Sequence, residues 1–264
     1  MGLNRTGFAR ALIFFLILAT SVSFVLSQSA SAASAAGVTT TTSVWGGYLV
    51  NAPAASSGTL AVNTEWNVPK VTCTGSSELV DFWIFVEHEY NPDSGMMLAV
   101  TCSGTTATYV IAAYLTGSTL GGVGHSVSPG DKMQTIASVS VATGAGSLEI
   151  KDKTKGWTYS TTGSETPNTA LSGYIELGVC GTPNTVVCAS NGTAPMPKFT
   201  TAEFTNVEIT LYAHHGSIGS FLRVSSDSVS RLLEVDSANG HVVAEPNTIS
   251  KSSTGFSLMW KQGL

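Results

Sequence analysis

Apolar and polar residues alternate along several short runs of this chain. In residues 137–141 and 148–151 every second side chain is apolar, and residues 256–261 place Phe, Leu and Trp at alternate positions. A period of two is typical of a β-strand that buries one face, because successive side chains of a strand point to opposite sides. Gly, Ser, Asn and Pro separate the runs, and none shows helical periodicity. We therefore predict an all-β fold, an antiparallel sandwich.

One run is apolar on both of its faces. Residues 80–86 carry valine, phenylalanine or isoleucine at even positions, and Trp83 and Phe85 at odd ones. This pattern predicts a central strand that is covered on both sides, or one whose second face lines a groove. The run ends abruptly in Glu87, His88 and Glu89. The strand either runs out into solvent there or reaches the edge of a cleft.

The N-terminus has the pattern of an export signal. Arg5 and Arg10 precede an apolar run over residues 11–26, and small residues with A-x-A spacing follow. We predict a signal peptide over residues 1–36, which favours a secreted, extracellular protein. An uncleaved anchor is the alternative, but the run is shorter than the roughly 20 apolar residues of a bilayer span. Residues 37–44 are expected to be a flexible N-terminal segment, and residues 45–264 a single domain without a membrane span.

Charge narrows the range of partners. The chain has a net charge of −5, and only 11% of its residues are charged. Removal of Arg5 and Arg10 with the signal would make the remainder more acidic. Nucleic-acid binding needs a basic patch, so we expect no nucleic-acid partner. A sparsely charged exterior suits an acidic medium, because acid unfolds proteins largely by protonating paired carboxylates.

Standard catalytic and metal-binding motifs are missing. The sequence contains neither G-x-S-x-G nor H-E-x-x-H. Asp93-Ser94-Gly95 resembles half of an aspartic-peptidase signature without a second copy, and we interpret residues 91–95 as a turn. His214 and His215 would point to opposite faces of a strand and cannot easily share an ion. We expect no metal and no cofactor.

Several segments, in order, resemble the glutamic peptidases, or eqolisins, which were once grouped with the aspartic peptidases. The resemblance extends from Trp45 to Trp260. The matching segments are Ser43-Val44-Trp45-Gly46-Gly47-Tyr48, Trp66-Asn67-Val68-Pro69, Phe82-Trp83-Ile84, Ser128-Pro129-Gly130-Asp131, Gly146-Ser147-Leu148-Glu149-Ile150, Lys155-Gly156-Trp157, Ala202-Glu203-Phe204-Thr205-Asn206 and Thr254-Gly255-Phe256-Ser257-Leu258-Met259-Trp260. The resemblance implies a concanavalin A-like, lectin-like jelly roll. It also implies an acid endopeptidase in which a glutamate and a glutamine activate water.

The resemblance places the expected site on particular residues. The glutamine position corresponds to Ala99, and a supporting acid corresponds to Tyr114. The catalytic glutamate corresponds to Glu176 if one residue is deleted, and otherwise to Leu177. Glu87 matches an aspartate beside the groove. We therefore predict Glu176 and Glu87 as the catalytic residues, and a substrate groove lined by Trp45, Trp83, Ala99 and Tyr114.

Four cysteines follow the signal, and four allow three pairings that the sequence alone does not decide. Cys180 and Cys188 bracket a short loop of turn-forming residues, and the resemblance implies a close pair just after the catalytic glutamate. We predict the disulfides Cys180–Cys188 and, as the remaining pair, Cys73–Cys102.

Two functions from different classes follow. The first is a secreted acid endopeptidase of reduced competence, because an alanine at position 99 can neither donate nor accept a hydrogen bond. The second is a catalytically degenerate sandwich that binds peptide or glycan in the retained groove. A third hypothesis is a hydrolase whose site differs from that of the family and uses Glu87 and Glu176 as an acid–base pair. We expect a polypeptide substrate or ligand and a monomer.

Overall fold

The strands form where the alternation predicts them. The computed structural model describes residues 38–42, 45–75, 78–88, 92–115, 121–164, 172–180, 196–222, 229–235 and 241–261, all within the unit Ser34–Leu264. The predicted signal peptide lies outside these residues. In the described residues the elements are β1 (Val38–Thr42), β2 (Trp45–Ala52), β3 (Thr59–Asn67), β4 (Val71–Thr72), β5 (Leu79–His88), β6 (Pro92–Ser103), β7 (Thr106–Leu115), β8 (Gly121–Gly122), β9 (Lys132–Ser140), β10 (Ala145–Asp152), β11 (Trp157–Ser164), β12 (Gly173–Cys180), β13 (Lys198–Phe199), β14 (Ala202–Tyr212), β15 (His214–Ser217), α1 (Ile218–Phe221), β16 (Val229–Val235), β17 (Val242–Pro246) and β18 (Phe256–Trp260).

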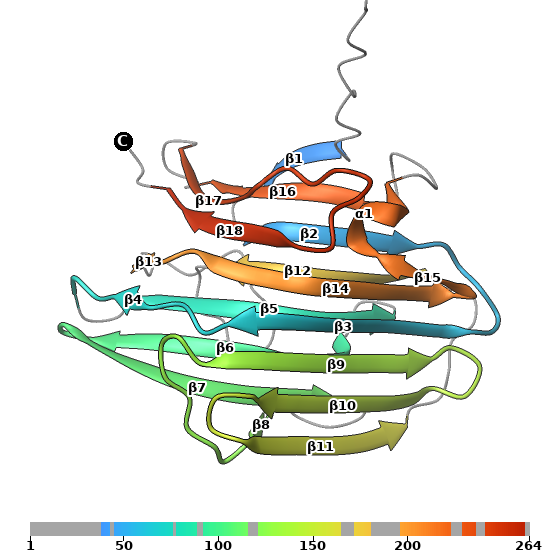
Figure 1. Ribbon diagram of the computed structural model, residues 1–264, viewed down its shortest axis with the longest axis horizontal. Helices are drawn as coiled ribbons and strands as arrows, with labels where there is room; N and C mark the ends of the chain where they lie inside the picture. The colour runs from blue at the N-terminus through green and yellow to red at the C-terminus, as the bar shows by residue number, and fades with distance from the viewer. Residues whose placement is uncertain are drawn as a thin grey trace, which may run out of the picture. The chain divides into compact units, whose positions relative to one another are not determined.

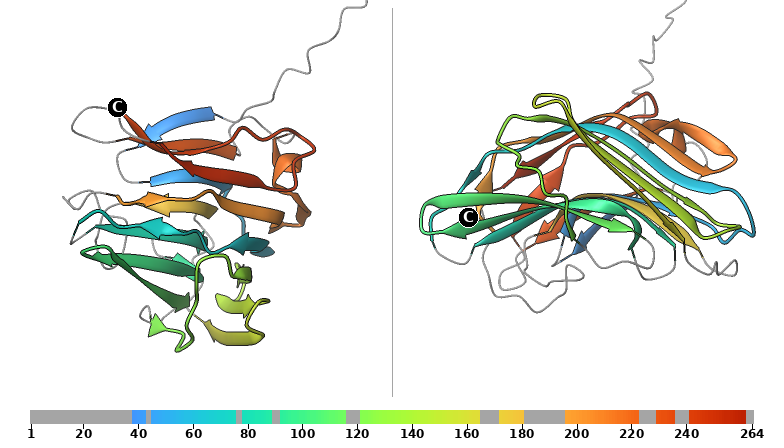
Figure 2. Two further views of the ribbon diagram at one scale, coloured as in Figure 1. Left: turned by 60° about the vertical axis from the view of Figure 1, so that its left-hand side comes forward. Right: turned by 90° about the horizontal axis from the view of Figure 1, so that it is seen from below.

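The strands follow one hydrogen-bonded path that folds back on itself (Figure 1). The path runs β11-β10-β9-β3-β14-β18-β17-β16-β2-β12-β5-β6-β7-β8, and every pairing along it is antiparallel. Strands β3, β9 and β10 pack across β5, β6 and β12, which gives two layers (Figure 2). The prediction of an all-β antiparallel sandwich is confirmed.

The hydrophobic core lies between the two layers. Even-numbered side chains of β5, from Val80 to Val86, enter it from one layer, and alternate residues of β9 and β3 enter it from the other. Burial alternates residue by residue along β3 and β9, as expected for strands with one covered face. Strand β5 is the exception, because nine of its ten residues are buried. The sequence pattern of a strand covered on both faces is therefore confirmed for β5.

Two local predictions need correction. Within the segment expected to be flexible, residues 38–42 form β1, which pairs in parallel with β16. The threonines of this segment have high β-propensity, which low sequence complexity concealed. The turn expected over residues 91–95 is wrong for Pro92 to Gly95, which begin β6. The Ser94 hydroxyl donates to the Ser147 carbonyl oxygen of β10 at 2.8 Å, which holds this stretch against the other layer.

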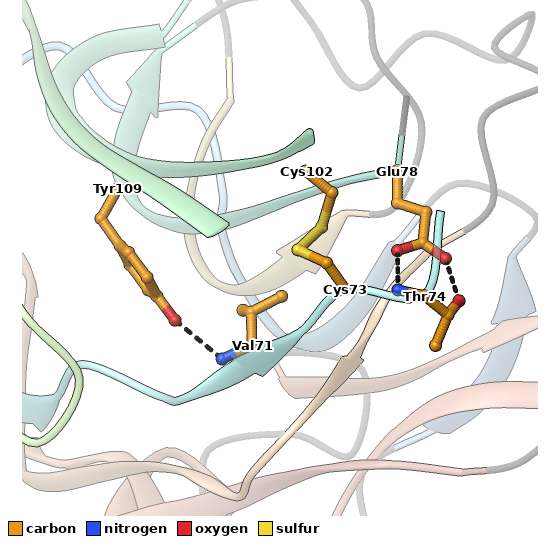
Figure 3. Close-up of a disulfide and its surroundings, with 6 residues drawn as sticks. All are labelled: Val71, Cys73, Thr74, Glu78, Cys102 and Tyr109. Carbon is orange, nitrogen blue, oxygen red and sulfur yellow. Dashed lines mark hydrogen bonds between the residues drawn. A yellow bond between two sulfur atoms is a disulfide. The ribbon is translucent and has the colours of Figure 1, made fainter. Parts of the chain in front are cut away.

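A disulfide fixes the start of β5. Cys73 and Cys102 are bonded, as predicted, with their Cα atoms 5.6 Å apart. Figure 3 shows that Glu78, just before β5, accepts hydrogen bonds from Thr74, and that the Val71 amide donates to the Tyr109 hydroxyl. These contacts join β4, β5, β6 and β7 at one end. Cys180 is also disulfide-bonded, but Cys188 lies outside the described residues, so that pairing stays a prediction.

In the described residues, helical structure is limited to one short turn. Helix α1 has four residues and packs against β14 and β15. None of the helices in the described part of the chain has the length and apolarity of a membrane span.

Candidate active site

The face of β2, β12, β5 and β6 that is turned away from the core carries the candidate chemistry. We call it the site face. Because side chains alternate along a strand, the odd-numbered residues of β5 point there when the even-numbered ones enter the core. These are Asp81, Trp83, Phe85 and Glu87, all of which are buried. The site face is therefore a second, partly apolar surface that carries carboxyl groups.

The register brings Glu87 and Glu176 together. Tyr174 of β12 lies opposite Glu87 of β5, and Glu176 lies opposite Phe85. Glu87 and Glu176 are thus diagonal neighbours on one face, with a Cα separation of roughly 7–8 Å. Leu177 faces the core and is fully buried. Of the two residues that the motif allowed, Glu176 is the one on the same face as Glu87.

The two carboxyl groups oppose each other's ionisation. Burial raises the pKa of Glu87 to about 6, although a hydrogen bond from Tyr174 partly stabilises the carboxylate. Burial, together with the negative charge of Glu87, raises the pKa of Glu176 well above its ordinary value of 4.5. Two carboxyl groups in this relation lose their protons in separate steps. From about pH 6 upward, the pair therefore holds a single proton until Glu176 ionises.

Aromatic side chains lie next to the pair on the site face, and we call this apolar cluster the aromatic floor. Trp83 and Phe85 are in contact, with ring centroids 4.6 Å apart, and Met97 and Tyr114 pack against them. Phe85 is fully buried directly opposite Glu176. An apolar floor lowers the local dielectric constant, which strengthens the interaction between the two carboxyl groups. The predicted groove residues Trp83 and Tyr114 thus belong to the apolar cluster that borders the pair. Trp45 of β2 pairs with Cys180 of β12, and its side chain lies outside the described residues.

No amide side chain stands next to Glu176 on β6. Ala99 lies on the site face opposite Asp81, four residues along β5 from Phe85, or about 13 Å at the usual strand rise. Gly95 lies opposite Phe85, and a Cβ there would meet the Phe85 ring at 2.2 Å. Met97, opposite Trp83, is the nearest described side chain of β6 on this face.

Asp81 is a site-face residue that the sequence analysis did not select. It is 4% exposed, and its Oδ1 atom is buried without a hydrogen-bond partner. Burial raises its pKa to about 7. In the sequence, Asp81 is the single charged residue of the apolar run 80–86, and its odd number places it on the same strand face as Glu87.

Other candidate groups remain outside the site. His214 and His215 lie in β15, which pairs with β14 in the other layer. In the described part of the chain, one group of metal-ligand side chains comes together, formed by Cys73, Glu78 and Cys102. The two sulfur atoms are bonded to each other and are therefore not available as thiolate ligands.

The comparisons agree with this architecture. The structure resembles that of scytalido-glutamic peptidase with a transition state analog inhibitor, with a TM-score of 0.58 and 20% identity over 83% of this chain and 98% of that one. Aspergilloglutamic peptidase from Aspergillus niger gives a TM-score of 0.44 and 13% identity over 69% and 99% of the two chains. A search of curated proteins found no match. Residues 43–254 match the Peptidase A4 family. The chain therefore belongs to the Peptidase A4 family, the glutamic peptidases that its motifs resemble.

Proposed function

We propose that this protein is a secreted peptidase that hydrolyses polypeptides slowly, with Glu87 and Glu176 as its acid–base pair. The observation that carries the proposal is the coupling of these two carboxyl groups on an aromatic floor. Pairs of titratable groups whose environments separate their pKa values supply an acid and a base at the same pH. The export pattern of residues 1–36 and the bonded cysteines support secretion.

Each carboxyl group has a separate role in this proposal. Glu87, with a pKa of about 6 after burial and its hydrogen bond from Tyr174, takes a proton from water. The oxygen of that water attacks the peptide carbonyl carbon. Glu176, which keeps its proton to higher pH, donates it to the carbonyl oxygen, so that a gem-diol forms. As the C–N bond breaks, Glu87 donates the proton that it took from water to the leaving nitrogen, and Glu176 recovers its proton from a gem-diol hydroxyl. The working form is the singly protonated pair, so hydrolysis should become faster as the pH rises through about 6.

The lack of an amide side chain at the described site-face positions of β6 limits the rate. Loss of one hydrogen-bond donor to a developing oxyanion costs about 100–1000-fold, and Gly95, Met97 and Ala99 carry none. General acid–base catalysis contributes about 100–10,000-fold, below the 10⁶-fold or more that is typical of enzymes. The same observation favours a second candidate function, in which the site face binds peptide or glycan without cleaving it.

A cleavage assay with unfolded protein as substrate, between pH 2 and pH 8, tests the proposal. We expect slow turnover with an acid limb near pH 6, and a loss of about 100-fold or more in Glu176→Gln and in Glu87→Gln. Glu203→Gln, which removes an exposed carboxylate of β14, is the matched control and should behave as wild type. Turnover that survives both glutamine substitutions would disprove the assignment. Peptide binding without turnover in the wild type would support the second candidate.

A further inference from the structure

Burial of the Asp81 carboxyl group without a hydrogen-bond partner for its Oδ1 atom costs free energy. Its exposed fraction is 4%, and Oδ1 has no partner. A buried polar atom without a hydrogen bond destabilises the folded state, and more so if it is charged. The proposed hydrolysis does not use Asp81, because the group lies about 13 Å along β5 from Phe85 and Glu176. Such a group in a native structure calls for an explanation, and a ligand is one.

The described strand positions around Asp81 offer it no partner of opposite charge. Directly opposite are Ala99 on β6 and Cys180 on β12, and Cys180 is disulfide-bonded and does not titrate. Trp83, two residues along, has a buried Nε1 atom that also lacks a partner. Among the described site-face positions of β2, β12, β5 and β6 there is no Lys, Arg or His. Among the described residues of these strands, the face carries Asp81, Glu87 and Glu176 without a compensating cation, and a bound molecule with a positive charge would supply one.

The spacing fits a bound polypeptide. Four residues of extended chain cover about 13 Å, and residues four apart point to the same side. A chain lying along β5 with one peptide bond at Glu176 would therefore present a side chain to Asp81. We propose that Asp81 determines specificity by receiving an arginine or lysine side chain about four residues from the cleaved bond. This inference rests on the proposed function, because it assumes that polypeptide lies on the site face.

The chemistry favours arginine over lysine. A guanidinium group donates two parallel hydrogen bonds to a carboxylate, and the residue opposite Asp81 is the small, partly exposed Ala99. Burial raises the pKa of Asp81 to about 7, so the group is neutral in acid until a cation arrives. The nearest acidic groups on the face are Glu87 and Glu176, at the level of Phe85 or beyond it. The preference for arginine should therefore be stronger at pH 7.5 than at pH 5.

The experiment compares peptides that differ by one charge. Ten-residue neutral peptides, blocked at both ends and fluorescently labelled, carry a single arginine at each position in turn, and citrulline at the same position is the neutral isostere. Binding to the purified protein is measured by fluorescence anisotropy at pH 7.5 and at pH 5. We expect arginine to bind about 10–100-fold more tightly than citrulline at one position or two adjacent ones, as for a hydrogen bond to a charged group.

Two variants distinguish the inference from its alternatives. Asp81→Asn should reduce the arginine preference to less than about twofold, and Ala99→Leu should do the same by filling the space while it leaves the carboxyl group intact. Glu203→Gln should keep the full preference. An unchanged preference in either site-face variant overturns the role of Asp81 while peptide binding still supports the proposed function. Failure of every peptide to bind the wild type overturns the proposed function and this inference with it.

Discussion

Replacement of Met97 by glutamine is expected to increase the rate of peptide hydrolysis by about 10–100-fold, part of the 100–1000-fold that one oxyanion donor supplies. Met97 lies opposite Trp83, two residues along the strands from the level of Glu176, or about 7 Å. Its side chain is partly exposed on the site face beside the aromatic floor. An amide there can reach the carbonyl oxygen of a substrate held at Glu176.

Ala99→Gln is the matched control for Met97→Gln. Ala99 faces the same side but lies about 13 Å along the strands, beyond the reach of an amide side chain. On a substrate that lacks arginine and lysine, we expect its turnover to stay within about twofold of wild type, and to need a second change near Tyr114 for any further gain. Both rates are measured as kcat/KM on the same unfolded substrate near pH 6.5. A greater gain in Ala99→Gln than in Met97→Gln would show that the substrate carbonyl lies at the other end of β5.

The free energy of unfolding is expected to be highest in mild acid and to fall as the pH rises toward 8. Burial raises the pKa of Asp81 from 3.8 to about 7. A group whose pKa is raised on folding stabilises the protein fully below its unfolded pKa, and that contribution is lost as the pH rises through the folded value. A shift of about three pH units at about 1.4 kcal/mol each corresponds to roughly 4 kcal/mol for Asp81. Glu87 and Glu176 act in the same direction.

Asp81→Asn should remove most of this pH dependence. Urea unfolding at pH 4 and at pH 8 should show that the variant loses about 4 kcal/mol less than wild type between the two values. Glu245 works in the opposite direction, since hydrogen bonds from Arg231 and Lys261 outweigh its burial and lower its pKa. Its contribution is lost as the pH falls, which limits stability in strong acid. Equal pH dependence in wild type and Asp81→Asn would contradict the burial of an ionisable, unpaired Asp81.

The faces of the strands could be predicted from the sequence, but the offset between strands could not. Alternation in residues 80–86 indicates which side chains of β5 share a face, and Glu87 follows by parity. The level at which Ala99 or Met97 meets Glu176 depends on how β6 pairs with β5, and that pairing includes a register shift beside Glu87. A shift of two residues leaves the face of a side chain unchanged and moves it about 7 Å. Motif matching alone cannot detect such a shift.

Asp81 and β1 were missed for different physical reasons. One acidic residue in an apolar run reads as an interruption of the strand, and only the two buried faces of β5 show that it lies inside the protein. Residues 38–42 read as low complexity, whereas their strand exists because the edge of β16 is available for pairing. Both features depend on contacts between residues far apart in the chain, which local composition does not reveal.

The central claim is that Glu87 and Glu176 act as one coupled pair. Carbon-13 NMR titration of labelled glutamate carboxyl groups tests it most directly. We expect Glu87 to titrate at about 6 and Glu176 at a clearly higher pH, because burial and the neighbouring charge both raise its pKa. In Glu87→Gln, the pKa of Glu176 should fall toward the value set by burial alone. Independent titration of both groups near 4.5, with Glu176 unchanged in Glu87→Gln, would contradict the account.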